Sequence, residues 1–354
     1  MRHDQWQSFQ KAARQAADAT TPVALIVDSP WIPGYLGASH LDYFLDPELW
    51  FQANLKIARD FPEVIPLPSW WVEYGMAIEP SAFGARPQFW IDRTPDVTPV
   101  LKNIADVEGL PPVNPLSDGL MPFALGLYRR HRARILDHGF TIPMVAARGP
   151  LCLAGFLRGV SDFMMDVAEN PEGVHKLLKI TTATVIDWLK AQADAVGDTV
   201  EGILVLDDIV GFLSTAAYRE FAHPYLRQIC AAFPAEWVKV YHNDANIRPC
   251  LADLPDTGFD VLNWSHKVDF TQAREKTGGR LCLMGNVPPL DVAVRGTPEM
   301  VRESARSVLA KADGKGLILS VGGGASPGMP GENIRALVDA LASWTEEKAR
   351  AAAR

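Results

Sequence analysis

The residues best suited to chemistry follow a short apolar run, Val238–Tyr241, in the stretch VKVYHNDANIRP. His242 and Asp244 stand two positions apart, so in an extended segment they share a face and can serve one proton or one metal ion. Asp207 and Asp208 follow a second apolar run, GILVL. Adjacent strand residues point to opposite faces, so only one of these two acids faces a common site, and we favour Asp208.

Polar residues and glycines end the other apolar runs in the same way. In chain order these ends are Asp28, Glu73, Arg148, Asp208, His242 with Asp244, Asn263 with His266, Asn286 and the glycine run Gly322–Gly324. Glu73 joins Asp208, His242 and Asp244 as a candidate catalytic residue. Asp28, Asn263, Asn286 and Gly323 are candidate substrate contacts, and a glycine there lets backbone approach a ligand closely.

Eight near-continuous apolar runs, most of them separated by helical patterns, must position these residues. Buried parallel strands read this way, and eight such units favour an α/β fold of the (β/α)8 TIM-barrel type, with chemistry at the carboxyl ends of the strands. An open doubly wound sheet would require a glycine-rich phosphate turn after an early strand, which the sequence lacks. We expect one domain over residues 1–354, with the barrel at about 22–340.

Two additions to the barrel are expected. Residues 3–18 predict an N-terminal helix, polar on one side, lying over the outside of the fold. Residues 80–122 are rich in proline and lack a clear period, so they predict a long loop-rich insertion after the second strand. Tryptophan and tyrosine are frequent in the N-terminal third, and Trp31 and Tyr35 in its loops are expected to line an apolar substrate pocket.

Composition excludes several classes of function. The chain has 354 residues, 48% hydrophobic and 21% charged, which is enough for a large core. Its net charge of −8 argues against nucleic-acid binding. The sequence has no membrane-spanning apolar window and no secretory signal pattern, so no membrane association is expected. The four cysteines form no CxxC pair and indicate reduced thiols in a cytoplasmic enzyme.

Several segments resemble the uroporphyrinogen decarboxylase superfamily in order along the chain. They are GPLCLAGFLRG, LVLDDIVGFLSTAAYREFAHPYLRQI, YHNDAN, DVLNWSHKVD, MGNVPPLDVAVRGTPEMV and GGGASPGMPGENIRAL. The resemblance covers about residues 22–340 and implies a (β/α)8 barrel. It also implies one of two activities, porphyrinogen decarboxylation or methyl transfer to a corrinoid with zinc as activator. Barrels of this superfamily commonly pair, so the resemblance makes a homodimer one alternative and leaves the oligomeric state open.

The chain departs from the decarboxylase pattern where that enzyme binds its acidic substrate. The MRQAGRY-type arginine segment is replaced by VDSPWIPGY, which holds Asp28 and Trp31 and no arginine. Phe156 stands at the tyrosine position of the GAPWTL-type motif, Asp208 at the serine after the fourth strand, and Gly323 at the late histidine. An octacarboxylate would meet acids and aromatic side chains here, which disfavours porphyrinogen decarboxylation.

The chain also departs from the zinc motif of the methyltransferases. The His-x-Cys ligands read His242-Asn243-Asp244, and the later GCG-type cysteine is Gly323. Both cysteine ligands are therefore absent, and a thiolate zinc site of that pattern is excluded. A harder nitrogen and oxygen site remains an alternative, with His242 and Asp244 as ligands and Glu73 or Asp208 as the third.

The preferred hypothesis is a methyltransferase that removes a methyl group from a small methoxy-aromatic or similar molecule. The corrinoid would be carried by a partner protein, because the chain has no DxHxxG-type cobalamin module. One alternative is a metal-free decarboxylase or lyase for a substrate smaller than a porphyrinogen, with Asp208 and His242 in acid-base roles. A barrel that only binds a ligand or partner is a third.

Overall fold

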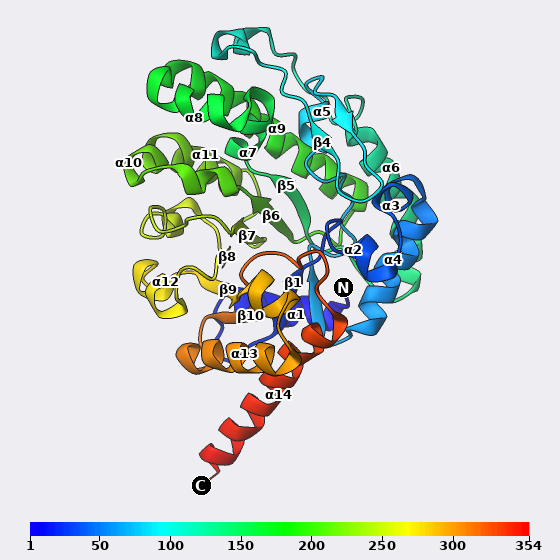
Figure 1. Ribbon diagram of the computed structural model, residues 1–354, viewed down its shortest axis with the longest axis vertical. Helices are drawn as coiled ribbons and strands as arrows, with labels where there is room; N and C mark the ends of the chain where they lie inside the picture. The colour runs from blue at the N-terminus through cyan, green and yellow to red at the C-terminus, as the bar shows by residue number, and fades with distance from the viewer. Residues whose placement is uncertain (354) are drawn as a thin grey trace.

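The structure is a computed structural model that describes residues 1–353. Its centre is a curled sheet of eight parallel strands, in the order β2-β1-β10-β9-β8-β7-β6-β5. The strands are β1 (Val23–Ile26), β2 (Val64–Leu67), β5 (Val145–Arg148), β6 (Gly202–Leu206), β7 (Val238–Asn243), β8 (Val261–Trp264), β9 (Cys282–Val287) and β10 (Leu317–Val321). Helices surround the sheet (Figure 1), so the expected TIM-type α/β fold is confirmed.

The helices connect successive strands and cover the outer face of the sheet. They are α1 (His3–Ala13), α2 (Ile32–Leu36), α3 (His40–Leu45), α4 (Pro47–Asp60), α5 (Ile78–Ser81), α6 (Met121–Asp137), α7 (Pro150–Arg158), α8 (Val160–Glu169), α9 (Pro171–Val196), α10 (Thr215–Ala217), α11 (His223–Ala231), α12 (Phe270–Lys276), α13 (Pro298–Ala312) and α14 (Gly331–Ala352). The last part of α14 projects away from the barrel (Figure 1). None of the helices in residues 1–353 is long and apolar enough to cross a membrane.

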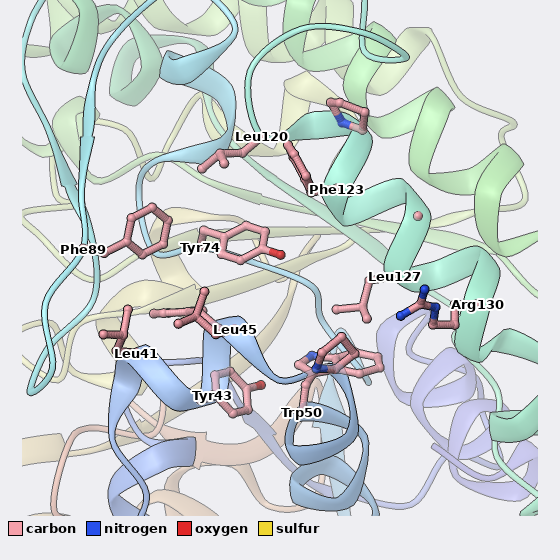
Figure 2. Close-up of a pocket in the computed structure, with 14 residues that line it drawn as sticks. Leu41, Tyr43, Leu45, Trp50, Tyr74, Phe89, Leu120, Phe123, Leu127 and Arg130 are labelled. Atoms are coloured by element: carbon pink, nitrogen blue, oxygen red, sulfur yellow. The ribbon is translucent and has the colours of Figure 1, made fainter.

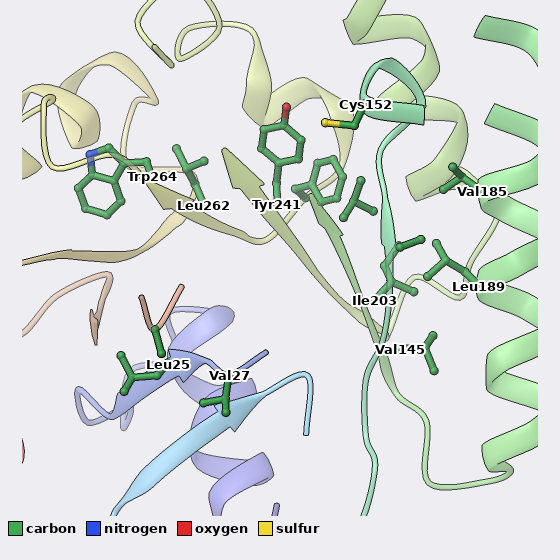
Figure 3. Packing of buried hydrophobic residues seen from close by; sticks show 14 of the residues in the cluster. Leu25, Val27, Val145, Cys152, Val185, Leu189, Ile203, Tyr241, Leu262 and Trp264 are labelled. Carbon is green, nitrogen blue, oxygen red and sulfur yellow. The ribbon is translucent and has the colours of Figure 1, made fainter. Parts of the chain in front are cut away.

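Strand residues alternate between two hydrophobic clusters, as the two-residue period of a strand requires. Ile203 and Val205 of β6 face the helices and pack in the outer cluster, which also includes Leu25, Tyr241 and Leu262 (Figure 3). Leu204 and Leu206 of β6 belong instead to the interior cluster. The seven other strands of the eight-stranded sheet also contribute to this cluster. The barrel interior is therefore a packed core, and polar chemistry is restricted to its ends.

The N-terminal helix differs from its expected position. Helix α1 ends at Ala13, and its Trp6 and Phe9 are buried in the interior cluster of the barrel. Gln5 donates hydrogen bonds to the carbonyl oxygens of Pro62 and Val64 at the start of β2. The helix thus closes the amino-terminal end of the barrel, because its apolar side is needed to cover the strand ends there.

The expected insertion after the second strand is present and contains little regular structure. It includes α5, the two-residue strands β3 (Pro87–Gln88) and β4 (Asp96–Val97), and a 3₁₀ turn, η1 (Ile104–Gly109). Elsewhere the connections have short turns, η2 (Asp208–Phe212), η3 (Tyr218–Ala222), η4 (Leu254–Thr257) and η5 (Pro289–Val294).

The backbone ladder of the barrel has one seam. In residues 1–353, strand pairing joins all neighbours around the sheet except β2 and β5, the strands that flank the long insertion. Side chains serve the free backbone groups there. The Gln192 amide donates to the Ala146 carbonyl oxygen (2.9 Å), and the Arg148 amide donates to the Glu79 carboxylate (2.9 Å). Neither bond reaches β2 itself, and the Arg148–Glu73 ion pair (3.2 Å) links the end of β5 to the segment that follows β2.

Candidate active site

Three ligand-type side chains meet where β6 and β7 end. Asp208, His242 and Asp244 each place one oxygen or nitrogen within 4.8 Å of the others. The His242 Nε2 lies 3.6 Å from Asp208 Oδ1, and the Asp244 amide donates to the same Oδ1 at 3.0 Å. His242 is 5% exposed, whereas Asp208 is only half-buried and Asp244 is exposed, so the group faces outward from the barrel core.

Asn263, at the matching register position on β8, holds the imidazole of His242. Its Oδ1 lies 2.6 Å from His242 Nδ1, and its Nδ2 donates to the carbonyl oxygens of Met284 (2.9 Å) and Val321 (3.2 Å). Because the amide nitrogen is engaged by two carbonyls, the oxygen must face the ring and accept from Nδ1–H. The Nε2 lone pair is then left for a proton or a metal ion.

The glycine run after β10 passes directly beside this group. Gly323 has a φ of +146°, and a Cβ at that position would lie 3.1 Å from Asp244 Oδ2. Asp244 is exposed as a whole residue, but its carboxyl lies against Asp208 and the Gly323 backbone, and this partial enclosure raises its pKa; the charge of Asp208 adds to the shift and His242 opposes it. The absence of a side chain at Gly323 therefore leaves room for the Asp244 carboxyl beside the backbone.

Asp207 faces the helix layer, as alternation along β6 requires. It is fully buried, and its carboxylate accepts hydrogen bonds from the amides of Leu151 (3.1 Å) and Cys152 (2.8 Å) in the first turn of α7. Burial raises its pKa to about 7 despite these hydrogen bonds. Asp207 is thus a helix-anchoring residue, and Asp208 is the member of the pair that joins His242.

Glu73 lies in a second group, at the ends of β1, β2 and β5. It accepts from the Ser29 amide (2.6 Å) and pairs with Arg148 at 3.2 Å, both side chains being less than a tenth exposed. Glu79 accepts from the Arg148 amide, and the Asp28 carboxyl beside them has a buried Oδ1 with no hydrogen-bond partner in residues 1–353. Three buried carboxyl groups therefore share one arginine.

The excess of carboxyl groups changes their proton affinity. Burial raises the pKa of Asp28 well above its ordinary value, and the charge of Glu73 raises it further. Burial also raises the pKa of Glu73 and of Glu79, while Arg148 opposes both shifts. Among the three carboxyl groups, Asp28 is therefore the one whose protonated form the surroundings favour most.

Sequence comparison assigns the chain to a family. The family model "Uroporphyrinogen decarboxylase (URO-D)" matches residues 9–344. The chain belongs to the uroporphyrinogen decarboxylase family. Among curated relatives, a uroporphyrinogen decarboxylase from Coxiella burnetii is 28% identical over 84% of this chain and 82% of its own length. One from Chlorobaculum parvum is 26% identical over 69% of this chain and 70% of its own length.

Solved structures show the same fold. A methyltransferase from Methanosarcina mazei superimposes with a TM-score of 0.82 at 22% identity, covering 96% of this chain and 99% of that one. A B12-independent methionine synthase from Shewanella sp. W3-18-1 gives a TM-score of 0.61 at 14% identity, covering 94% and 98%. These similarities place the URO-D barrel of this chain beside enzymes with more than one activity.

Within this URO-D barrel, the four predicted catalytic residues separate into two groups. Asp208, His242 and Asp244 lie close together. Glu73 instead forms an ion pair with Arg148, on the other side of Gly322–Gly324. Of the two predicted third ligands, Asp208 is the one that lies within 4.8 Å of the ligand atoms of His242 and Asp244. Glu79 was not predicted, because a single acid inside an aperiodic segment gives no signal in the sequence.

Only some of the predicted substrate contacts lie at the carboxyl ends of the strands. Trp31 is 1% exposed and donates from its indole nitrogen to the Met329 carbonyl oxygen, and Tyr35 stacks on it. The space around its ring is a cavity of only about 10 Å³, beside Leu25 and Phe61, so a substrate-lining role for Trp31 stays a prediction. Phe156 is half-buried in the hydrophobic layer around α7, and Asn286 donates to the Val268 carbonyl oxygen (2.8 Å).

The apolar pocket lies elsewhere in the N-terminal third. A cavity of about 590 Å³, the α4–α6 cavity, opens between α3, α4, α6 and the segment after β2 (Figure 2). Aromatic and aliphatic side chains dominate its wall. The lining residues are Leu41, Tyr43, Phe44, Leu45, Pro47, Trp50, Tyr74, Phe89, Leu120, Pro122, Phe123, Gly126, Leu127 and Arg130.

Proposed function

We propose that this protein is a methyltransferase that moves a methyl group from a small methylated molecule, such as a methoxy-aromatic compound, to a corrinoid on a separate carrier protein. The observation that carries the proposal is the group of Asp208, His242 and Asp244, with the Nε2 of His242 directed at two carboxylates. Two of its members, His242 and Asp244, stand at positions where the resemblance to the methyltransferase branch implies metal ligands. The methyltransferase name of the Methanosarcina mazei neighbour adds support.

The residues present fit a zinc site made of nitrogen and oxygen ligands, without thiolates. One imidazole nitrogen and two carboxylate oxygens lie within 4.8 Å of one another, and such a set suits zinc with an open fourth position. Zinc held there would polarise the oxygen from which the methyl group departs. Asn263 fixes the His242 ring through Nδ1, as the neighbours of metal-binding histidines usually do.

The chain's own residues also suit the leaving oxygen. When the methyl group departs as an electrophile, the substrate oxygen keeps the bonding electron pair and requires a proton or a cation. Without the metal ion, the raised pKa of the Asp244 carboxyl favours a form that could donate this proton. Asp208 and His242 flank it and can receive the proton or return it.

The charge at the carboxyl ends of the barrel strands argues against a porphyrinogen substrate. Carboxyl groups of Asp28, Glu73, Asp208 and Asp244 stand near the strand ends, and Arg148 is already paired with Glu73. A substrate with eight carboxylates would add like charges to a site that holds unneutralised acids. A neutral or weakly charged substrate fits this field better.

The test uses purified protein, a reduced corrinoid carrier protein and a panel of methoxy-aromatic compounds. Methyl uptake is followed by the absorbance change of the corrinoid, and zinc content is measured in parallel. We expect His242→Ala to lose both, whereas His138→Ala, at an exposed histidine, keeps both. The proposal fails if no methoxy compound changes the corrinoid spectrum, whatever the metal content.

A decarboxylase or lyase acting on a smaller substrate is the second candidate. The names of the curated relatives support it, and so does the placement of a carboxyl with raised pKa beside His242. This activity would release carbon dioxide or another cleaved fragment in the absence of any corrinoid protein. Measuring gas release with the carrier omitted separates the two candidates.

A further inference from the structure

The α4–α6 cavity is large and mostly apolar. Its volume of about 590 Å³ falls in the range usual for small-molecule sites, roughly 300–1,000 Å³. Phe44, Tyr74 and Phe89 form one aromatic wall, with ring centroids of 5.5 Å between Phe44 and Tyr74 and 6.2 Å from each to Phe89. Such a wall accepts a flat ring by stacking or by edge-to-face contact.

Two polar groups interrupt the apolar lining. Figure 2 shows the Tyr74 hydroxyl pointing into the cavity and Arg130 lying on the α6 side. Arg134, one turn further along α6, is paired with Glu48. Arg130, in contrast, is exposed and has no carboxylate within ion-pair distance among residues 1–353. The cavity therefore offers one hydroxyl and one free positive charge.

We propose that the α4–α6 cavity binds a small organic acid with an aromatic body. The ring would pack against Phe44, Tyr74 and Phe89, and the carboxylate would accept hydrogen bonds from the Arg130 guanidinium, which matches a planar carboxylate in shape. The proposal concerns binding alone and does not depend on the reaction at His242.

The charges around the cavity favour an anion over a cation. No acidic side chain lines it, since the lining residues of the described chain contain arginine as their only charged type. Four acids adjoin lining residues along the chain, and each has another partner. Glu48 pairs with Arg134 and Glu73 with Arg148, while Asp46 accepts from the Glu48 amide and Asp42 from the Ser39 hydroxyl. An aromatic amine would therefore find apolar contacts here but no counter-charge.

The experiment measures binding of 2-naphthoate to the full chain by calorimetry, with 2-naphthamide as the neutral analogue. We expect the acid to bind more tightly than the amide. Arg130→Gln should weaken binding of the acid by about fivefold, as expected for a partly exposed charged hydrogen bond, and leave the amide unchanged. Arg129→Gln is the matched control, because Arg129 is exposed on the same helix and does not line the cavity.

A second pair of variants tests the position of the ligand. Gly126 lines the cavity, and a Cβ there would have no heavy atom within 4 Å, so larger side chains can enter the space without disturbing the fold. Gly126→Leu should abolish binding of 2-naphthoate, and Gly126→Ala should reduce it little. Equal binding in all variants, or equal affinity for acid and amide, would overturn the proposal. So would a dimer in solution whose partner copy covers the exposed Phe123 and Leu45.

Discussion

The interaction between Asn263 and His242 allows a quantitative test of the proposed metal site. Replacing Asn263 by leucine keeps the approximate side-chain volume and removes the oxygen that lies 2.6 Å from His242 Nδ1. The imidazole then loses the contact that sets its tautomer and its orientation toward Asp208 and Asp244. We therefore expect Asn263→Leu to weaken zinc binding without removing any ligand.

The size of the effect follows from the geometry. Loss of such a supporting contact typically lowers metal affinity by about 10–100-fold, which corresponds to about 1.4–2.8 kcal/mol. The free energy of unfolding should fall as well, because the carbonyl oxygens of Met284 and Val321 lose their donor, at about 1–3 kcal/mol for each buried group. The two losses must be separated experimentally.

Asn286→Leu provides the matched control. Asn286 is 7% exposed and donates one hydrogen bond to the Val268 carbonyl oxygen, so its replacement also costs stability inside the barrel. It makes no recorded contact with His242 within residues 1–353. Zinc affinity is measured by competition with a chromophoric chelator, and stability by urea denaturation of metal-free protein. Unchanged affinity in Asn263→Leu, or an equal loss in Asn286→Leu, would refute the reasoning.

Three further predictions concern neighbouring residues. Gly323→Ala should lower zinc affinity, because the new Cβ would lie 3.1 Å from Asp244 Oδ2. Gly328→Ala should leave zinc affinity unchanged, since a Cβ at Gly328 would have its nearest neighbour at 3.8 Å. The chelator competition assay compares the two variants. Arg148→Met should lower the free energy of unfolding by about 3–5 kcal/mol, as it leaves buried carboxylates without their cation; urea denaturation tests this. Burial raises the pKa of Asp207 from 3.8 to about 7, so its stabilising contribution is fully present below the unfolded-state pKa and is lost as pH rises through about 7. Asp207→Asn should remove that part of the pH dependence of stability, seen in denaturation series between about pH 4 and 8.

The fold was predictable because its pattern is strongly expressed in the sequence. All eight predicted strands are present, since strands buried on both faces give continuous apolar runs. Local capping was also predictable. Asp46 accepts from the Glu48 amide at the start of α4, and Ser214 accepts from the Ala217 amide at the start of α10. These features depend on residues close together in the chain.

The site was predictable only where strand register determines it. His242 of β7 pairs in register with Asn263 of β8 and Leu206 of β6, so the ends of these strands converge on one place. Glu73 and Trp31 lie on irregular segments, where the sequence does not specify direction. The structure places the Glu73 carboxylate against Arg148, with which it forms an ion pair, and the Trp31 ring in the core, where its indole nitrogen donates to the Met329 carbonyl oxygen.

The seam between β2 and β5 has a consequence for motion. All other neighbouring strands of the barrel are hydrogen-bonded to each other, but here the Ala146 carbonyl oxygen and the Arg148 amide depend on the side chains of Gln192 and Glu79. A rotamer change in one side chain releases such a bond, whereas opening a ladder requires a whole strand to move. We expect local unfolding to begin at this seam, and amide hydrogen exchange at Arg148 to precede that of the central strands β7 to β9. The barrel would then flex beside the α4–α6 cavity, while the strands that carry His242 and Asn263 stay rigid.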